Sequence, residues 1–330
     1  MTARIHRGPD AEGLTDLLSD ESRMLGAADG IAQPADEDAL AAILQACAES
    51  GECVTVSSAL TGITGAGVPQ GGVLVNLARM DRIVGLRREG GVWYVRCQPG
   101  VVLSALREAV ASGAFAHAET WDAESRALLD EFRDGPAQVF SPDPTETSAT
   151  LGGMAACNAS GARSFHYGPM RAYVEGVRGL LVDGRRFALR RGEVTAAADR
   201  TFRLPLEDGS AVEGRLPAYD TPRVKNAAGY FAADGMDLVD LFIGSEGTLG
   251  ILTELEVRLT PAPPEILGLV AFLPDEDAAL RFVRSLRGQG EAPLPERPLA
   301  VEFFDHRALD LLRALREEES GGDVPEIPAA

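Results

Sequence analysis

Residues 142–168 read PDPTETSATLGGMAACNASGARSFHYG, a stretch of glycines, alanines and hydroxyl side chains with almost no bulk. Glycine lets a backbone approach a ligand closely and adopt positive φ. Small residues with hydroxyl and amide groups suit a wall against a large, flat, polar cofactor. The same composition is typical of a small-residue helix packed tightly in a core, so this stretch alone leaves both interpretations open.

Two other glycine-rich segments favour the cofactor. Residues 57–69 (SSALTGITGAGVP) follow the short β-branched run at 53–57, which predicts a buried strand. A strand that opens into Thr-Gly-x-Thr-Gly can align successive backbone N–H groups as an anion-binding nest, and the expected anion is a pyrophosphate. Residues 244–253 (GSEGTLGILT) form a glycine turn that runs into a predicted strand at 251–259.

With these segments in this order, the chain resembles the FAD-binding oxidases and dehydrogenases of the vanillyl-alcohol oxidase type. The resemblance runs from about residue 31 to the end and lies in the branch of glycolate oxidase and D-lactate dehydrogenase. Residues 61–65 match the family's pyrophosphate loop, 142–168 its flavin-contacting run, and 225–230 (KNAAGY) and 244–250 two further landmarks. The chain departs from the family at Ser58-Ala-Leu60, where Gly-Gly-Gly or Gly-Ala-Arg is common, so that Leu60 stands where glycine or arginine is usual.

The resemblance implies an α+β fold, namely a two-subdomain PCMH-type FAD-binding domain followed by the first part of a ferredoxin-like cap domain. The expected parts are an N-terminal helix and entry segment at 1–30, FAD-binding subdomain 1 with the pyrophosphate loop at 31–100, FAD-binding subdomain 2 at 101–260, and a partial substrate or cap domain at 265–330. The last part is expected to hold strands at 266–272 and 299–304, each followed by a helix. A complete cap needs more strands, so the chain is expected to be a fragment or one piece of a split enzyme.

Non-covalent FAD is the cofactor that the resemblance implies. Residues 57–65 contain neither histidine nor cysteine, and covalently flavinylated relatives carry an attachment histidine there. The residues expected to bind FAD are Ser57, Ser58, Ala59, Leu60, Thr61, Gly62, Thr64, Gly65, Pro142, Asp143, Thr147, Thr150, Gly152, Gly153, Asn158, Ser160, Gly161, Glu246, Gly247, Gly250 and Ile251.

The implied reaction is oxidation of a small 2-hydroxy acid, D-lactate or glycolate in kind, by hydride transfer to flavin N5. The electron acceptor and the catalytic base are unassigned. His166 and Tyr167 are weak candidates for the base, with shaping of the flavin edge as the alternative role. Lys225 is the one lysine among 31 basic residues, and either a site role or a plain ion pair fits it.

Two other functions stay open on the sequence. The chain could be a flavin-binding scaffold subunit, inactive without a partner that completes the cap, or a gene remnant that binds no flavin. Other classes of site lack their motifs: no Gly-x-Gly-x-x-Gly opens a helix, there is no Walker loop or Gly-x-Ser-x-Gly, and the four histidines show no metal-ligand spacing.

The composition indicates a cytoplasmic protein. A net charge of −19 opposes nucleic acid and anionic membranes as partners, because both attract basic patches. No apolar run approaches the length of a transmembrane segment, and the N-terminus lacks the apolar core of a secretory signal. The four cysteines form no Cys-x-x-Cys pair, which indicates buried free thiols in a reducing compartment.

Local patterns predict individual elements. Asp36 is expected to cap a helix that runs to Cys47, and a second helix is expected at 103–112. The runs at 72–77 and 92–97 are expected to be strands of one unit. Residues 179–189 are expected to form a hairpin that turns at Asp183-Gly184.

Overall fold

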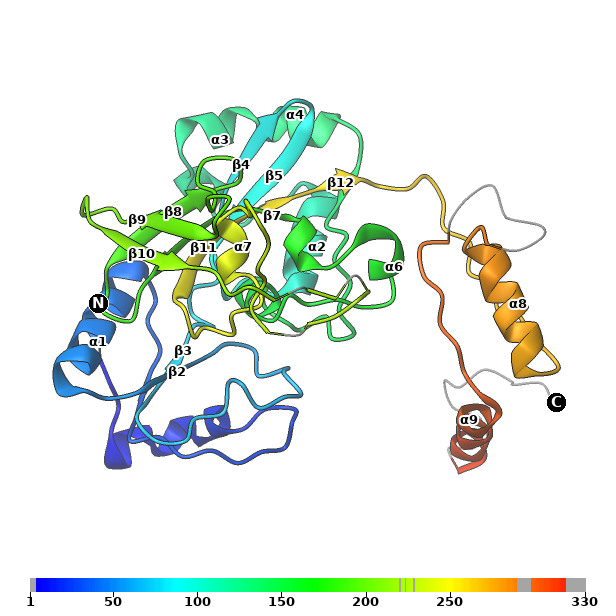
Figure 1. The fold of residues 1–330 in the computed structure, drawn as a ribbon, viewed down its shortest axis with the longest axis horizontal. Coiled ribbons are helices and arrows are strands. Elements are labelled where there is room, and N and C mark those ends of the chain that lie inside the picture. The colour runs from blue at the N-terminus through cyan, green and yellow to red at the C-terminus, as the bar shows by residue number, and fades with distance from the viewer. Residues whose placement is uncertain (1–3, 220, 223, 228, 290–297, 319–330) are drawn as a thin grey trace. The chain divides into compact units, whose positions relative to one another are not determined.

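The computed structural model describes residues 4–219, 221–222, 224–227, 229–289 and 298–318 (Figure 1). The chain separates into two units. The first comprises Met1–Gly161 and Gly168–Ala262, and the second comprises Ala162–Tyr167 and Pro263–Ala330. The first unit combines helices with sheets, which is the expected α+β class.

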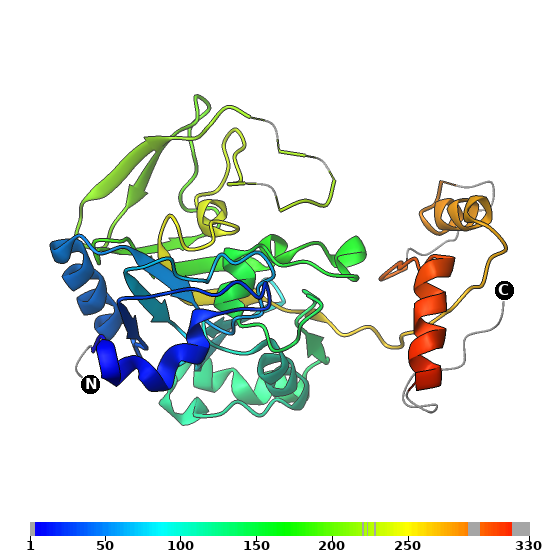
Figure 2. The same cartoon turned by 90° about the horizontal axis from the view of Figure 1, so that it is seen from below.

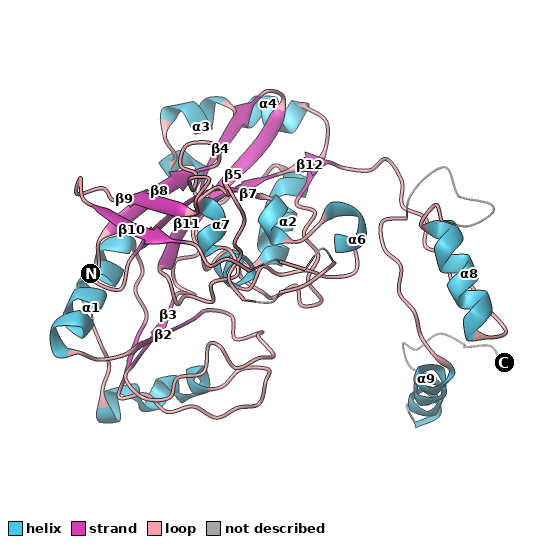
Figure 3. Cartoon of the chain, in the orientation of Figure 1, coloured by secondary structure: helices cyan, strands magenta, loops and turns pink. Residues whose placement is uncertain are grey.

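The first unit contains a five-stranded antiparallel sheet (magenta in Figure 3). Its order is β4-β5-β11-β7-β8, with β4 Ile83–Glu89, β5 Val92–Cys97, β7 Val174–Leu180, β8 Arg186–Arg190 and β11 Ile251–Arg258. Trp93, Val95 and Cys97 alternate along β5 and are all buried, so one face of the sheet is apolar. β7 and β8 form the predicted hairpin, and Gly184 in its turn has φ +82°.

Aromatic side chains from two short helices pack on this apolar face. Phe242 of α7 (Val239–Phe242) stacks on Phe187 of β8 with ring centroids 4.2 Å apart. Phe132 of α4 (Leu129–Asp134) meets Trp93 edge to face at 5.0 Å. The unit also contains α2 Leu103–Ser112, as predicted, α3 Ala123–Ala127, α5 Leu151–Ala156 and the 3₁₀ helices η2 Ala118–Thr120 and η3 Met170–Ala172.

A second, parallel sheet lies in the N-terminal part of this unit. Its order is β1-β3-β2, with β1 Gly30–Ala32, β3 Val73–Asn76 and β2 Val54–Ser57. The helix α1 (Glu37–Ser50) connects β1 to β2, and the 3₁₀ helix η1 (Gly8–Leu18) precedes β1. Asp36 caps α1 as predicted, because its side chain accepts a hydrogen bond of 2.8 Å from the N–H of Ala39.

The start of α1 ties the two sheets together. Glu37 accepts a hydrogen bond of 2.5 Å from Thr253 of β11 and one of 2.8 Å from Arg186 of β8. Leu180 and Ile251 of the antiparallel sheet belong to the same apolar cluster as the buried face of α1. The start of α1 is therefore bonded to β8 and β11, and Val54 and Val56 of β2 pack against the same apolar cluster.

The runs at 72–77 and 92–97 form strands β3 and β5, both in the first unit but in different sheets. β5 pairs with β4 and β11, whereas β3 lies between β1 and β2. Strand pairing depends on residues far away in the chain, here β11, so a local apolar pattern cannot assign a strand to a sheet. Two small ribbons complete the unit: β9 Thr201–Pro205 with β10 Ala211–Arg215, and β6 Gln138–Val139 with β12 Thr260–Pro261.

The cysteines were expected to be buried and free. All four are free, and Cys47 and Cys97 are buried. Cys53 and Cys157 are exposed, so the expected burial is wrong for these two. Each of them lies just outside a regular element, Cys53 before β2 and Cys157 after α5, where the backbone leaves the packed interior.

The second unit contains α6 Ser164–Tyr167, α8 Glu276–Leu286 and α9 His306–Glu318. α8 and α9 are the two predicted helices. Their axes point in very different directions, since Figure 1 shows α8 lengthwise and α9 end-on, and Figure 2 shows the reverse. The predicted strands at 266–272 and 299–304 are wrong, because neither segment has strand structure. Residues 266–272 leave their large apolar side chains exposed, and without a ladder partner an apolar run does not form a strand.

Candidate functional site

The predicted pyrophosphate loop begins where β2 ends. Asn76, at the end of the neighbouring β3, donates from Nδ2 to Ser57 Oγ at 3.0 Å and to the carbonyl of Ser58 at 2.8 Å. These two bonds fix the point where the chain leaves the sheet. Gly65 closes the loop with φ +75°, a conformation that glycine adopts without strain.

The predicted flavin run places its small residues against backbone. A Cβ atom on Gly161 would lie 1.6 Å from the carbonyl oxygen of Asp143, and one on Gly152 would lie 2.4 Å from Pro99 Cβ. These two glycines therefore serve close packing, as the alternative interpretation of the run expected. Gly153 differs, because a Cβ atom there would come closest to Thr150 Oγ1, at 3.3 Å.

The glycine turn at 244–250 joins the other two segments. Gly244 and Glu246 donate their backbone N–H groups to the carbonyls of Ala155 and Ala156, at the end of α5, over 2.9 Å each. A Cβ atom on Gly247 would lie 3.5 Å from Val56 of β2. The three segments that the sequence singled out therefore meet in the first unit, around the carboxyl end of β2 and the end of α5.

Two buried hydroxyl groups in these segments fit a polar ligand. Ser58 Oγ and Thr150 Oγ1 are buried and have no hydrogen-bond partner among the described residues. Leaving such a group unpaired costs about 1–3 kcal/mol, and a bound group that supplies a partner recovers that energy. One hydroxyl belongs to the pyrophosphate loop and the other to the flavin run, so the residues present fit a dinucleotide cofactor that spans both.

Three residues of the site have left-handed backbone without being glycine. They are Leu60 at φ +59°, Asn158 at +47° and Glu246 at +51°, one from each segment. Non-glycine residues in this region carry strain and cluster at functional sites. At Leu60 the chain takes a conformation that glycine adopts without strain.

Substituting Leu60 with glycine should stabilise the chain by about 0.5 kcal/mol. Relief of left-handed strain, about 1–2 kcal/mol, exceeds the entropy that glycine adds to the unfolded chain, about 0.5–1 kcal/mol. Ile63→Gly is the control, because Ile63 is exposed and lacks positive φ. That variant should be less stable than the parent. Thermal unfolding compares the three proteins. A melting temperature below that of the parent for Leu60→Gly would contradict the inference that Leu60 is strained.

Other predicted residues already have protein partners. Arg107 donates to the carbonyl of Pro142 and to the carboxylate of Asp143, at 2.8 Å each. Asp143 is therefore held by a cation rather than standing alone in its Pro-Asp-Pro turn. Lys225 Nζ lies 3.5 Å from the carbonyl oxygen of Gly161, which places the single lysine beside the flavin run.

His166 and Tyr167 belong to α6 in the second unit, with their rings edge to face at 4.7 Å. Of the three weak catalytic candidates, Lys225 therefore lies with the three segments, whereas His166 and Tyr167 belong to the second unit. Among the residues that the structure describes, no group of histidine, cysteine and acidic side chains could hold a metal ion.

Sequence reasoning missed the buried ion network behind these segments. Asp240 is 8% exposed and pairs with Arg171 at 3.0 Å and Arg191 at 2.8 Å. Burial lowers the pKa of Arg171, and the charge of Asp240 opposes that shift. No signal in the sequence distinguishes these two arginines, because nearly every basic residue of the chain is an arginine.

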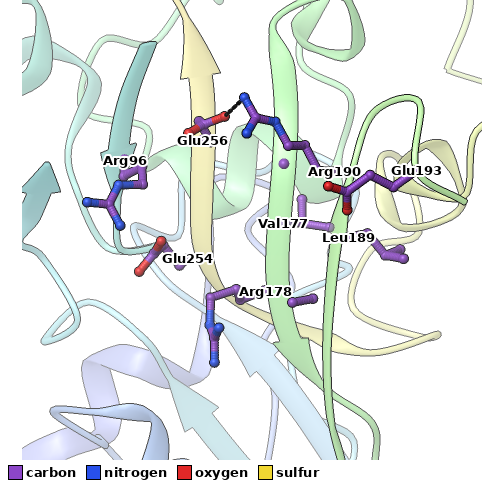
Figure 4. Close-up of a pocket in the computed structure, with 10 residues that line it drawn as sticks. Arg96, Val177, Arg178, Leu189, Arg190, Glu193, Glu254 and Glu256 are labelled. Carbon is purple, nitrogen blue, oxygen red and sulfur yellow. Dashed lines mark ion pairs between the residues drawn. The ribbon is translucent and has the colours of Figure 1, made fainter. Parts of the chain in front are cut away.

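A cavity of about 220 Å³ lies on the outer face of the antiparallel sheet and includes none of the predicted site residues (Figure 4). Its arginines have carboxylate partners: Arg178 pairs with Glu207 at 2.8 Å, Arg190 with Glu89 at 3.1 Å, and Arg96 with Asp122. Burial raises the pKa of Glu254 in this cavity. We interpret it as a charged sheet face rather than a second site.

The predicted pyrophosphate loop at 57–65 lies in a region that matches a known family. Residues 28–125 match the model of a family described as FAD binding domain. The chain is 31% identical to the D-lactate dehydrogenase of Anaerostipes hadrus over 258 residues, which are 77% of this chain and 42% of that protein. It is 28% identical to the glycolate oxidase subunit GlcD of Bacillus subtilis over 283 residues, which are 85% of this chain and 46% of that protein. The chain thus spans about half the length of these relatives.

Solved structures share the fold. A chitooligosaccharide oxidase superposes with a TM-score of 0.55 at 16% identity, over 86% of this chain and 47% of that one. The 6-hydroxy-D-nicotine oxidase of Arthrobacter nicotinovorans gives a TM-score of 0.53 at 14% identity, over 81% and 44%. In the described part of the chain, every helix is too short or too polar to cross a membrane.

Proposed function

The chain carries an FAD binding domain of the vanillyl-alcohol oxidase type and is homologous to D-lactate dehydrogenases and glycolate oxidase, and on this premise we propose that it serves an FAD-dependent oxidation of a small 2-hydroxy acid. The observation that carries the proposal is the meeting of three segments, two of which carry a buried hydroxyl group with no hydrogen-bond partner among the described residues. The relatives' names support the reaction class.

The loop at 57–65 would hold the pyrophosphate. Its backbone N–H groups follow the end of β2, and Asn76 fixes the first turn of the loop. Ser58 Oγ is free to donate a hydrogen bond to a phosphate oxygen. Anion binding by successive N–H groups needs no basic side chain, which agrees with the absence of lysine and arginine from 57–69.

The small-residue run and the 244–250 turn would line the flavin. Gly153 leaves its face open, Thr150 offers an unpartnered hydroxyl, and Asn158 lies at the end of α5. The other predicted contacts in these two segments are Pro142, Asp143, Thr147, Gly152, Ser160, Gly161, Glu246, Gly247, Gly250 and Ile251. Bound FAD supplies a hydride acceptor at N5. A base for the substrate's hydroxyl proton is unassigned, and Lys225 is the candidate that lies with these segments.

Anaerobic bleaching tests the reaction. Purified chain loaded with FAD should lose its yellow absorbance when D-lactate or glycolate is added, and L-lactate is the control for chirality. Retained colour with every acid would contradict independent activity. It would support the second candidate, a flavin-binding subunit that requires a partner. We propose that residues 265–330 form part of a substrate or cap domain.

FAD should be bound without a covalent link, because residues 57–65 contain no histidine or cysteine to attach it. Precipitating the loaded protein with acid should leave the yellow colour in the supernatant. Colour that stays in the pellet after washing would show a covalent bond elsewhere in the chain. Free FAD mixed with denatured protein gives the baseline for colour carried down nonspecifically.

A further inference from the structure

Arg171 joins two of the three FAD-binding segments. Its guanidinium donates from Nη2 to the carbonyl of Ile243 at 2.5 Å, and from Nη1 to the carbonyl and the carboxylate of Asp240 at 2.7 and 3.0 Å. Ile243 immediately precedes Gly244, the first residue of the glycine turn. A planar guanidinium can reach these acceptors together, so it fixes where the turn begins.

The main chain of the same residue fixes the other segment. The N–H of Arg171 donates to Asn158 Oδ1 at 3.0 Å. Asn158 has φ +47° and follows Cys157, the C-cap residue of α5. The strained turn at Asn158 and the start of the glycine turn are therefore bonded to a single residue, one through its backbone and one through its side chain.

Further groups hold Arg171 itself. Arg191 donates to the carbonyl of Arg171 at 2.9 Å and to Asp240 at 2.8 Å. The guanidinium of Arg171 lies 4.4 Å from the ring centroid of Phe231, next to the predicted 225–230 landmark. With 17% of its side chain exposed, Arg171 is enclosed by groups that leave it one arrangement.

We propose that Arg171 is a positioning residue for FAD: it sets the spacing between the Asn158 turn and the 244–250 turn, and it does not itself contact the cofactor. The inference rests on the proposed function. The alternative is that the network only stabilises the fold, because breaking any buried ion pair lowers stability.

The chain offers a closely matched control. Arg87 and Glu256 form a bidentate pair at 2.9 and 2.7 Å, and their side chains are 17% and 11% exposed, the same as those of Arg171 and Asp240. This pair lies on strands β4 and β11 and bonds to none of the predicted FAD-binding residues. Breaking this pair therefore measures the stability lost with a buried ion pair, while the predicted FAD-binding residues keep their contacts.

The experiment compares Arg171→Gln with Arg87→Gln in the full chain. FAD affinity is measured by flavin fluorescence quenching well below both melting temperatures, and the visible spectrum of the bound flavin is recorded. We expect at least tenfold weaker binding and a spectrum nearer to that of free FAD for Arg171→Gln. Arg87→Gln should stay within twofold of the parent in affinity and keep its spectrum.

Other results of this experiment would overturn either the inference about Arg171 or the proposed function. Parent-like affinity and spectrum in Arg171→Gln would overturn the inference, as would equal losses in both variants. If Arg171→Gln does not fold, Asp240→Asn replaces it, because this change keeps the side-chain volume and removes the charge that holds Arg171. A parent chain that takes up no FAD overturns the proposed function and the inference together, whereas the other failures overturn the inference alone.

Discussion

Replacing Gly161 with alanine should destabilise the first unit by at least about 3 kcal/mol, or roughly 6–12 °C in melting temperature. The new Cβ would lie 1.6 Å from the carbonyl oxygen of Asp143 and 2.7 Å from its carbonyl carbon. Both are backbone atoms, and Arg107 holds the carboxylate and the preceding carbonyl of that turn. The flavin run can admit the methyl group only if this turn moves.

Gly153→Ala is the control from the same run. Outside the backbone of its own helix, the one described atom within 4 Å of its Cβ would be Thr150 Oγ1, at 3.3 Å, and alanine favours helix over glycine by about 1 kcal/mol. Thermal unfolding without FAD should therefore place Gly153→Ala at or above the parent and Gly161→Ala well below it. If both melt with the parent, the close approach of residues 143 and 161 is not present in solution.

Replacing Gly65 with valine should weaken FAD binding at least tenfold, about 1.4 kcal/mol. The residue has φ +75°, which a β-branched side chain does not tolerate, so the loop must change shape and misalign its N–H groups. Flavin fluorescence quenching gives the affinity. Equal affinity in variant and parent would remove this loop from the cofactor site.

One contact complicates the interpretation of Gly65→Val. A Cβ atom there would lie 2.6 Å from Met24 Sδ, and Met24 is a half-exposed side chain that can move. The double variant Met24→Ala, Gly65→Val removes this clash and keeps the backbone conflict. If FAD affinity returns in the double variant, the clash rather than the loop conformation was the cause.

Local chemistry was enough to predict many elements and the candidate site. Asp36 and the acidic first turn predicted α1, Asp183-Gly184 predicted the β7–β8 turn, and the glycine segments predicted the loops that meet at the site. Each of these depends on residues a few positions apart. Their signals, a capping side chain or a residue that tolerates positive φ, can be read along the chain.

What the sequence could not supply depends on distant residues. β5 joins the antiparallel sheet because β11, more than 150 residues later, pairs with it. The apolar run at 266–272 has the composition of a strand but no partner, so composition was misleading there. Arg171 shows the same limit, since its role follows from Asn158 and Ile243, which only the fold brings to it.

The two exposed cysteines give the site its own chemical reporters. Cys157 directly follows α5, and Cys53 precedes the strand that leads into the pyrophosphate loop. Although the residue is partly open to solvent, the protein around the thiol of Cys157 raises its pKa, and Glu246 adds to the effect. Alkylating reagents attack the thiolate, so we expect Cys157 to react slowly near neutral pH, and more slowly with Glu246 charged beside it. The rate of labelling at this sulfur should therefore change if Glu246 or the packing around Cys157 moves, and this readout does not depend on flavin colour.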